Sequence, residues 1–233
     1  MKTVIAGGTS GIGLATAAML AQEGKEVIIT GRNEQKLAQA LASLPKGVSG
    51  QIVDSTNPLA LQQFMAATGS FHHLVLALSG AKGAGLFKDL DIAVLREGFE
   101  EKLFPQLYTL QAALPYLAAG GSVTFISAVS GHARHAGISG LAAINSALEA
   151  IVPILAKELQ PTRVNAVSPG VVDTPWWSFL PDDARRDLFK QYGQTSPAGR
   201  VGQPEDIAGL ITHIINNSFI TGQVITIDGG LAL

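Results

Sequence analysis

Short and nearly uninterrupted apolar segments alternate with longer helical segments along the whole chain, and this alternation limits the fold more than any other feature. The expected strands are residues 4–6, 26–30, 48–53, 74–78, 122–127, 163–167 and 223–227. The expected helices span residues 12–23, 33–43, 57–67, 91–117, 139–159 and 204–216. Strands without polar alternation are typical of a parallel sheet that helices cover on both faces. The pattern therefore predicts a doubly wound α/β sheet with right-handed crossovers.

The composition fits one domain with a large core. Of the 233 residues, 47% are hydrophobic and 15% are charged, the latter well below the roughly 25% of an ordinary soluble chain. Because no linker, repeat or low-complexity tract is present, residues 1–233 are expected to form a single domain. The helix at 139–159 is apolar nearly all round, which suits either a long core helix or packing against a second subunit.

Charge and residue usage argue against several functional classes. A formal charge of −2 gives no electrostatic reason to expect nucleic acid. The absence of cysteine excludes disulfides, a thiolate nucleophile and zinc–thiolate sites. No metal site is expected, because His72 and His73 are isolated and are interpreted as a loop before the fourth strand. No stretch approaches the ~18 apolar residues of a membrane span, so a cytoplasmic location is expected.

A glycine-rich loop connects the first strand to the first helix. The loop reads Gly7-Gly8-Thr9-Ser10-Gly11-Ile12-Gly13. Glycines at 7, 11 and 13 allow a tight turn whose backbone approaches a pyrophosphate, with the helix N-terminus directed at its charge. A glycine trio alone is weak, but its place between a strand and a helix is the context that a dinucleotide site requires.

The end of the second strand bears on the choice of cofactor. An acidic residue there would bind the ribose 2′-hydroxyl of NAD, whereas an arginine suits the 2′-phosphate of NADP. The sequence has Arg32, and Ser10 could add a hydroxyl to the same phosphate. An ordinary surface arginine is the alternative. We therefore expect NADP(H) in preference to NAD(H).

These features occur together with three further motifs in a fixed order. Asp54 follows the third strand, Ser168–Thr174 (SPGVVDT) follows the sixth, and Thr221–Gly230 (TGQVITIDGG) closes the chain. In this combination the sequence resembles the short-chain dehydrogenase/reductase family over nearly its whole length. The resemblance implies a seven-stranded parallel sheet of order 3-2-1-4-5-6-7, a nicotinamide cofactor, a small-molecule substrate, and a homodimer or homotetramer.

The resemblance also implies roles for single residues. Asp54 would hold the adenine and Thr174 the nicotinamide carboxamide. Together with the loop, the expected cofactor-binding residues are Gly7, Thr9, Ser10, Gly11, Ile12, Gly13, Arg32, Asp54, Ser79, Gly80, Pro169, Gly170, Val172 and Thr174.

The resemblance breaks at the catalytic residues. Family members typically use a serine, a Tyr-x-x-x-Lys thirteen residues later, and an asparagine on the preceding long helix. The segments Phe125–Gly131 and Arg163–Gly170 set the register from both sides. In that register the four positions are occupied by Ala128, Leu141, Asn145 and Lys102. The usual catalytic residues are thus expected to be absent.

This replacement removes the usual proton donor. A positioned general acid is worth roughly 10²–10⁴ in rate, and leucine has no proton to give. His135, in the loop between Ala128 and Leu141, is one candidate substitute, and His132 is a weaker one. Lys102 is another, delivering a positive charge to the nicotinamide ribose or to a substrate anion; the alternative is that Lys102 extends to solvent.

Two further segments depart from the family pattern or carry bulky side chains. The loop after the fourth strand reads Ala77-Leu78-Ser79-Gly80, without the usual polar side chains, so a less rigid floor is expected there. The region of about 175–200, which contains both tryptophans, is expected to cap the site. It suits a large apolar ligand, or else forms an aromatic plug or a subunit contact.

Two functions therefore remain open at the level of sequence. One is an NADP(H)-dependent oxidoreductase that reduces or forms a carbonyl, or reduces an enone, by an atypical mechanism. The other is a catalytically inactive NADP(H)-binding pseudoenzyme that acts as a sensor or a partner subunit.

Overall fold

The computed structural model describes residues 1–233 as one parallel sheet flanked by helices. Seven strands are hydrogen-bonded in the order β3-β2-β1-β4-β5-β6-β7, which confirms the expected topology. They are β1 (Lys2–Ala6), β2 (Glu26–Gly31), β3 (Val48–Ile52), β4 (Phe71–Leu76), β5 (Leu117–Ile126), β6 (Arg163–Pro169) and β7 (Val224–Ile227).

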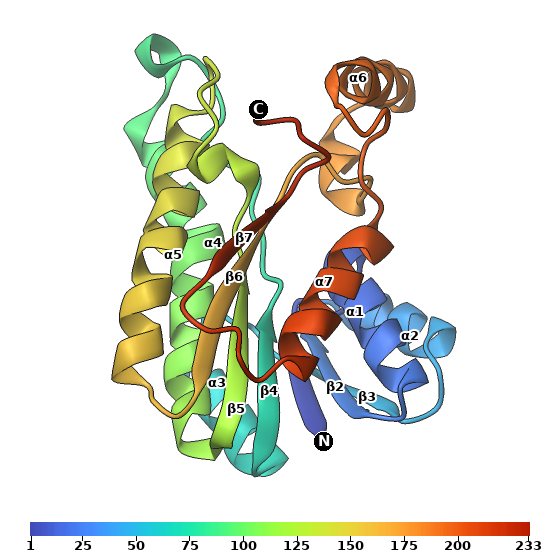
Figure 1. Ribbon diagram of the computed structural model, residues 1–233, viewed down its shortest axis with the longest axis vertical. Helices are drawn as coiled ribbons and strands as arrows, with labels where there is room; N and C mark the ends of the chain where they lie inside the picture. The colour runs from blue at the N-terminus through green and yellow to red at the C-terminus, as the bar shows by residue number, and fades with distance from the viewer.

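Helices cover both faces of the sheet, as Figure 1 shows. One face carries α1 (Gly11–Gln22), α2 (Glu34–Ser43) and α7 (Pro204–Asn216). The opposite face carries α3 (Pro58–Thr68), α4 (Ile92–Ala113) and α5 (Ser139–Glu158). The remaining helix, α6 (Asp182–Thr195), stands away from the sheet beside the short helical turn η4 (Pro175–Phe179).

Two apolar layers hold the helices to the sheet. Leu61 of α3, Leu103 of α4 and Leu148 of α5 belong to one buried cluster. Leu20 of α1 and Ile207 of α7 belong to the other. The central strands are buried nearly throughout, and this double cover explains why they are apolar without alternation.

The N-termini of the helices differ in whether a side chain caps them. Side chains cap α2 and α3, where Asn33 and Asn57 accept backbone N–H groups. In contrast, Ser10 at the start of α1 makes no side-chain cap. The first N–H groups of a helix have no intrahelical partner, so the N-terminus of α1 keeps donors for a ligand.

The fourth and fifth strands begin earlier than the sequence pattern predicts. The interpretation of His72 and His73 as a loop is wrong, because both lie in β4. The long helix ends at Ala113, not near residue 117, and a short helical turn (η2, Leu114–Tyr116) leads into β5. His73 is buried, and its Nδ1 lies 2.9 Å from the Ser122 hydroxyl on β5. A buried hydrogen-bonded imidazole thus replaces the apolar side chain that the pattern requires of a core strand.

The burial of His73 predicts an acid-sensitive fold. Desolvation, with a smaller effect from the Arg163 charge, lowers the pKa of His73 to about 4. The unfolded chain therefore takes up this proton near pH 6.5, whereas the folded chain takes it up only near pH 4. We expect His73 to cost up to about 3 kcal/mol of unfolding free energy as the pH falls through this window. Urea titrations at pH 7 and pH 4.5 measure it. His73→Asn, whose amide does not titrate, should lose much less between the two pH values; an equal loss in both proteins would contradict the assignment.

One helix corrects the expectation that no segment has the length and composition of a membrane span. The helix α5 has 20 residues and a mean hydropathy of 1.5 over its most apolar window. Here it packs against α4 and β6, and Ile144, Leu148 and Val152 on its buried side contribute to the core. This is the arrangement of a helix that covers a sheet.

Candidate functional site

A cavity of about 950 Å³ lies at the carboxyl ends of the strands. Loops that follow β1, β2, β3, β4, β5 and β6 line it, together with α4 and α5. The order of the sheet reverses between β1 and β4, and ligands of doubly wound sheets bind at such a switch point. The position alone thus identifies the candidate site.

All fourteen residues predicted to bind a cofactor line this one cavity. They are Gly7, Thr9, Ser10, Gly11, Ile12, Gly13, Arg32, Asp54, Ser79, Gly80, Pro169, Gly170, Val172 and Thr174. Five of the six residues considered for the catalytic centre also line it, namely Lys102, Ala128, His135, Leu141 and Asn145; His132 does not. The fold therefore brings together residues that the sequence separates by up to 167 positions, from Gly7 to Thr174.

The glycine loop forms a cradle that side chains would fill. Gly7 and Gly11 have positive φ angles of 82° and 51°, which favour glycine. A Cβ atom on Gly13 would lie 2.2 Å from the Gly7 carbonyl oxygen, so helix and turn touch through backbone alone. With the uncapped N-terminus of α1 beside it, this cradle fits a pyrophosphate.

Two cations stand at the outer end of the cavity. Arg32 follows β2, and Lys36 lies on the first turn of α2. Asp54 faces the same space, and hydrogen bonds from the Thr56 backbone N–H and hydroxyl (2.9 and 2.8 Å) lower its pKa, with a smaller contribution from the Arg32 charge. Arg32 and Lys36 make this end of the cavity suitable for a phosphate group.

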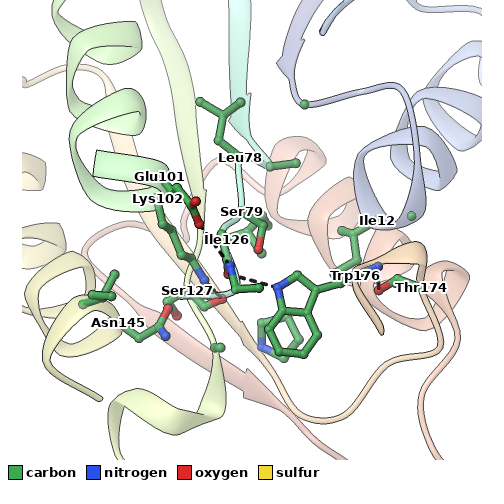
Figure 2. A pocket seen from close by; sticks show the side chains of 18 of the residues that line it. Ile12, Leu78, Ser79, Glu101, Lys102, Ile126, Ser127, Asn145, Thr174 and Trp176 are labelled. Carbon is green, nitrogen blue, oxygen red and sulfur yellow. Dashed lines mark hydrogen bonds between the residues drawn. The ribbon is translucent and has the colours of Figure 1, made fainter. Parts of the chain in front are cut away.

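The loop after β4 is held by partners that the sequence did not reveal. Gln106 Nε2 donates to the Leu78 carbonyl (3.1 Å), and Glu101 Oε2 accepts from Ala81 N–H (3.3 Å). From the other side of the cavity, Trp176 Nε1 donates to the Gly80 carbonyl (2.9 Å; Figure 2). Residues of α4 and η4 thus supply hydrogen bonds to this loop, although its own side chains lack the usual polar groups.

Trp176 belongs to an aromatic cluster at the cavity wall. Its ring lies edge-on to Trp177 and Phe179, with centroids 4.7 and 5.2 Å away, and Trp177 lies edge-on to Phe189 of α6 at 5.7 Å. Trp177 Nε1 also donates to the Val172 carbonyl (3.0 Å). The predicted capping region thus closes one side of the cavity with rings that are themselves hydrogen-bonded.

The positions where the family pattern expects a tyrosine and a lysine have a different chemistry. Leu141 offers an apolar side chain to the cavity. Asn145 is buried, and its Nδ2 donates to Ser130 Oγ and to the Leu141 carbonyl, both at 3.0 Å. Its Oδ1 has no hydrogen-bond partner in the protein. An unpaired buried acceptor is costly, so a ligand hydroxyl or amide would find a ready acceptor there.

Lys102 does not extend to solvent, and that alternative is wrong. The side chain points from α4 toward the end of β5, is only 7% exposed, and donates from Nζ to the Ser127 carbonyl at 3.0 Å (Figure 2). Burial lowers the pKa of Lys102 to about 8, and the Glu149 carboxylate limits the decrease.

A partly buried carboxylate, that of Glu149, acts on the charge of Lys102. Glu149 Oε1 accepts from the Ser127 and Ser168 hydroxyls (2.9 and 2.8 Å), and Oε2 lies 3.4 Å from His132 Nδ1. No sequence motif identified Glu149, since its partners lie just after β5, on β6 and at His132. His135 is exposed, lines the cavity and forms no hydrogen bond or ion pair with Glu149.

The fold is a Rossmann-type doubly wound α/β sheet with a cavity at its switch point, where proteins of this fold class bind ligands. A family profile described as Enoyl-(Acyl carrier protein) reductase matches residues 6–232. The chain belongs to the short-chain dehydrogenase/reductase family, whose members are NAD(P)-dependent oxidoreductases that commonly act as oligomers on small molecules.

Relatives and solved structures agree with this membership. The chain is 30% identical to 3-oxoacyl-acyl-carrier-protein reductase FabG of Thermotoga maritima, over 99% of this chain and 97% of that one. It is also 30% identical to carbonyl reductase family member 4 of Danio rerio, with the same coverage. Among solved structures, a small-chain dehydrogenase in complex with NADPH superposes with a TM-score of 0.85 at 28% identity, covering 100% of this chain and 98% of that one.

Proposed function

We propose that this protein is an NADP(H)-dependent oxidoreductase that transfers hydride to or from a carbonyl/alcohol pair or an enone, with a proton donor other than tyrosine. The observation that carries the proposal is the single cavity, which joins a glycine cradle, two cations and a buried amine. The NADPH-bound solved structure and the two reductases of similar sequence support this class of reaction.

The residues that line the cavity fit the phosphate groups of NADP(H). The N-terminus of α1 and the glycine cradle would hold the pyrophosphate, while Arg32 and Lys36 would bind the 2′-phosphate. When bound, the nicotinamide supplies or accepts the hydride. Thr174 would orient the nicotinamide ring, and the Trp176–Trp177 pair would exclude water from it.

The alternative is a pseudoenzyme that binds NADP(H) without turnover. Leu141 and Ala128 favour it, since neither side chain can donate a proton or a hydrogen bond at the positions where the family pattern places tyrosine and serine. In either case we propose a cytoplasmic homodimer or homotetramer that binds no nucleic acid.

NADPH fluorescence distinguishes the two functions. It is recorded after NADPH is mixed with the protein and then followed while ketones, aldehydes and enones are added. Enhanced fluorescence that then decays only with protein and substrate present supports the oxidoreductase. Stable enhancement that no substrate discharges supports the pseudoenzyme. No enhancement, and no thermal protection at millimolar NADPH, would overturn both.

Arg32→Ala should weaken the binding of NADPH much more than the binding of NADH. Removal of a charge-assisted hydrogen bond to the 2′-phosphate is worth about 1.5–3 kcal/mol. We expect NADPH to bind about 10- to 100-fold more weakly, while NADH affinity changes less than about threefold, as measured by fluorescence titration. Arg186→Ala, on the exposed side of α6, is the matched control. Equal weakening of both cofactors would show that Arg32 does not contact the 2′-phosphate.

A further inference from the structure

A buried amine lines the cavity beside the position that lacks tyrosine. Lys102 reaches the cavity from α4 and Leu141 lines it from α5, and these two helices pack against each other on the same face of the sheet. A lysine ammonium carries three donors, and the protein takes one of them, through the Ser127 carbonyl. The remaining N–H bonds of Lys102 are free for a ligand in the cavity.

The contact with Ser127 also fixes where the amine lies. The Ser127 carbonyl is at the end of β5, and the same residue's hydroxyl donates to Glu149 (2.9 Å). Glu149 is held in turn by Ser168 at the end of β6. Two adjacent strands and two helices therefore position the Lys102–Glu149 pair, without a direct hydrogen bond between them.

The surrounding charges are unequal in their effect on the amine. Glu149 on α5 is the one charged group that acts on Lys102 appreciably. His132 contacts Glu149, and its Nε2 lies 3.3 Å from Thr226 Oγ1 on β7. Lys82, Glu97, Glu100 and Glu101 line the outer part of the cavity, where Lys82 is paired with Glu97 and Glu101, and His135 is exposed.

We propose that Lys102 Nζ is the proton donor for the substrate oxygen, acting from α4 in place of the tyrosine that α5 lacks. This inference rests on the proposed oxidoreductase function. As the substrate carbon is reduced by hydride, its oxygen becomes negative and takes a proton from Nζ. The N–H electron pair stays on nitrogen, and the resulting neutral amine regains a proton from water. Glu149 is a positioning residue that keeps the ammonium protonated near neutral pH.

Three measurements test the assignment. The first is the titration of Lys102 by NMR in protein labelled with ¹³C at lysine Cε, with Lys102→Arg to identify its signal. We expect a midpoint near 8, and a lower midpoint in Glu149→Gln because the neighbouring negative charge is removed. This readout needs no substrate. A midpoint near the ordinary lysine value of ~10.4 would overturn the proposal.

The second measurement is the pH profile of carbonyl reduction. The rate should decline above the same midpoint, because the donor is then neutral, and the decline should move to lower pH in Glu149→Gln. A profile whose midpoint does not follow that of Lys102 would contradict proton donation from Nζ.

The third measurement distinguishes a proton donor from a fixed charge. Arginine keeps the positive charge but does not deprotonate, so Lys102→Arg should bind NADPH normally and reduce carbonyls at least about 100-fold more slowly. Lys157→Arg, on the exposed side of α5, is the control. If Lys102→Arg reduces carbonyls as fast as the wild type, this inference alone is overturned. If the wild type binds NADPH but reduces no substrate, both this inference and the oxidoreductase function are overturned. If the wild type does not bind NADPH at all, the proposed function itself is overturned.

Discussion

Gly13→Ala is expected to lose NADPH binding almost completely while the chain still folds. The added Cβ would lie 2.2 Å from the Gly7 carbonyl oxygen and 3.1 Å from the Gly8 Cα. Both neighbours are backbone atoms, so the turn itself has to move away from the helix. The donors that meet the pyrophosphate would move with it. Loss of about 3 kcal/mol of charge-assisted hydrogen bonding corresponds to a roughly 100-fold weaker affinity.

Fluorescence titration with NADPH measures this loss, and Gly209→Ala provides a matched control. Gly209 lies exposed on α7, and a Cβ there would meet no atom within 4 Å. The same substitution should therefore leave NADPH affinity unchanged and raise the unfolding free energy by about 0.5–1 kcal/mol, since alanine favours a helix. Binding by Gly13→Ala within threefold of the wild type would show that the cradle does not hold the phosphates.

Arg163→Met is expected to give the largest loss of stability. The guanidinium of Arg163 is buried and donates to the carbonyls of Ile214, Ile215 and Ile220 at 2.9–3.1 Å. The first two lie at the end of α7, where backbone carbonyls have no helical partner and where a cation is favoured. Methionine would leave the Ile214 and Ile215 carbonyls without this donor, whereas the Ile220 carbonyl would keep the Asn165 amide (2.9 Å). We expect the unfolding free energy to fall by about 3–5 kcal/mol, because each buried carbonyl left without a donor costs about 1–3 kcal/mol.

Urea denaturation at pH 7 measures this effect directly. Arg186→Met serves as the comparison, because Arg186 is exposed on α6 and pairs only with Asp183 one turn away. No measurable change is expected there. A loss below about 1 kcal/mol for Arg163→Met would mean that water replaces the guanidinium at the end of α7, and that the contact orders the loop without supporting the fold.

The order of the sheet and the position of the cofactor cavity were both predictable from the sequence. Continuous apolar strands and amphipathic helices are local patterns, and the glycine loop lies within seven consecutive residues. Arg32 and Asp54 come just after strands and Thr174 lies in the loop after β6, so their place at the carboxyl edge of the sheet follows from the topology. The start of β4 was missed because His72 and His73 do not look like core residues, and only pairing with β1 and β5 shows that His73 is buried.

By itself, then, the sequence determined the doubly wound fold and the glycine cradle at the end of the first strand, because short segments and fixed spacings specify them. The tertiary structure alone decided that Lys102 is buried, that Glu149 acts on its charge, and that Trp176 reaches the Gly80 carbonyl. Trp176 and Gly80 are 96 positions apart, and Lys102 and Ser127 are 25 apart. No local pattern encodes such contacts, since they depend on which loops the packing of strands and helices brings to one edge of the sheet.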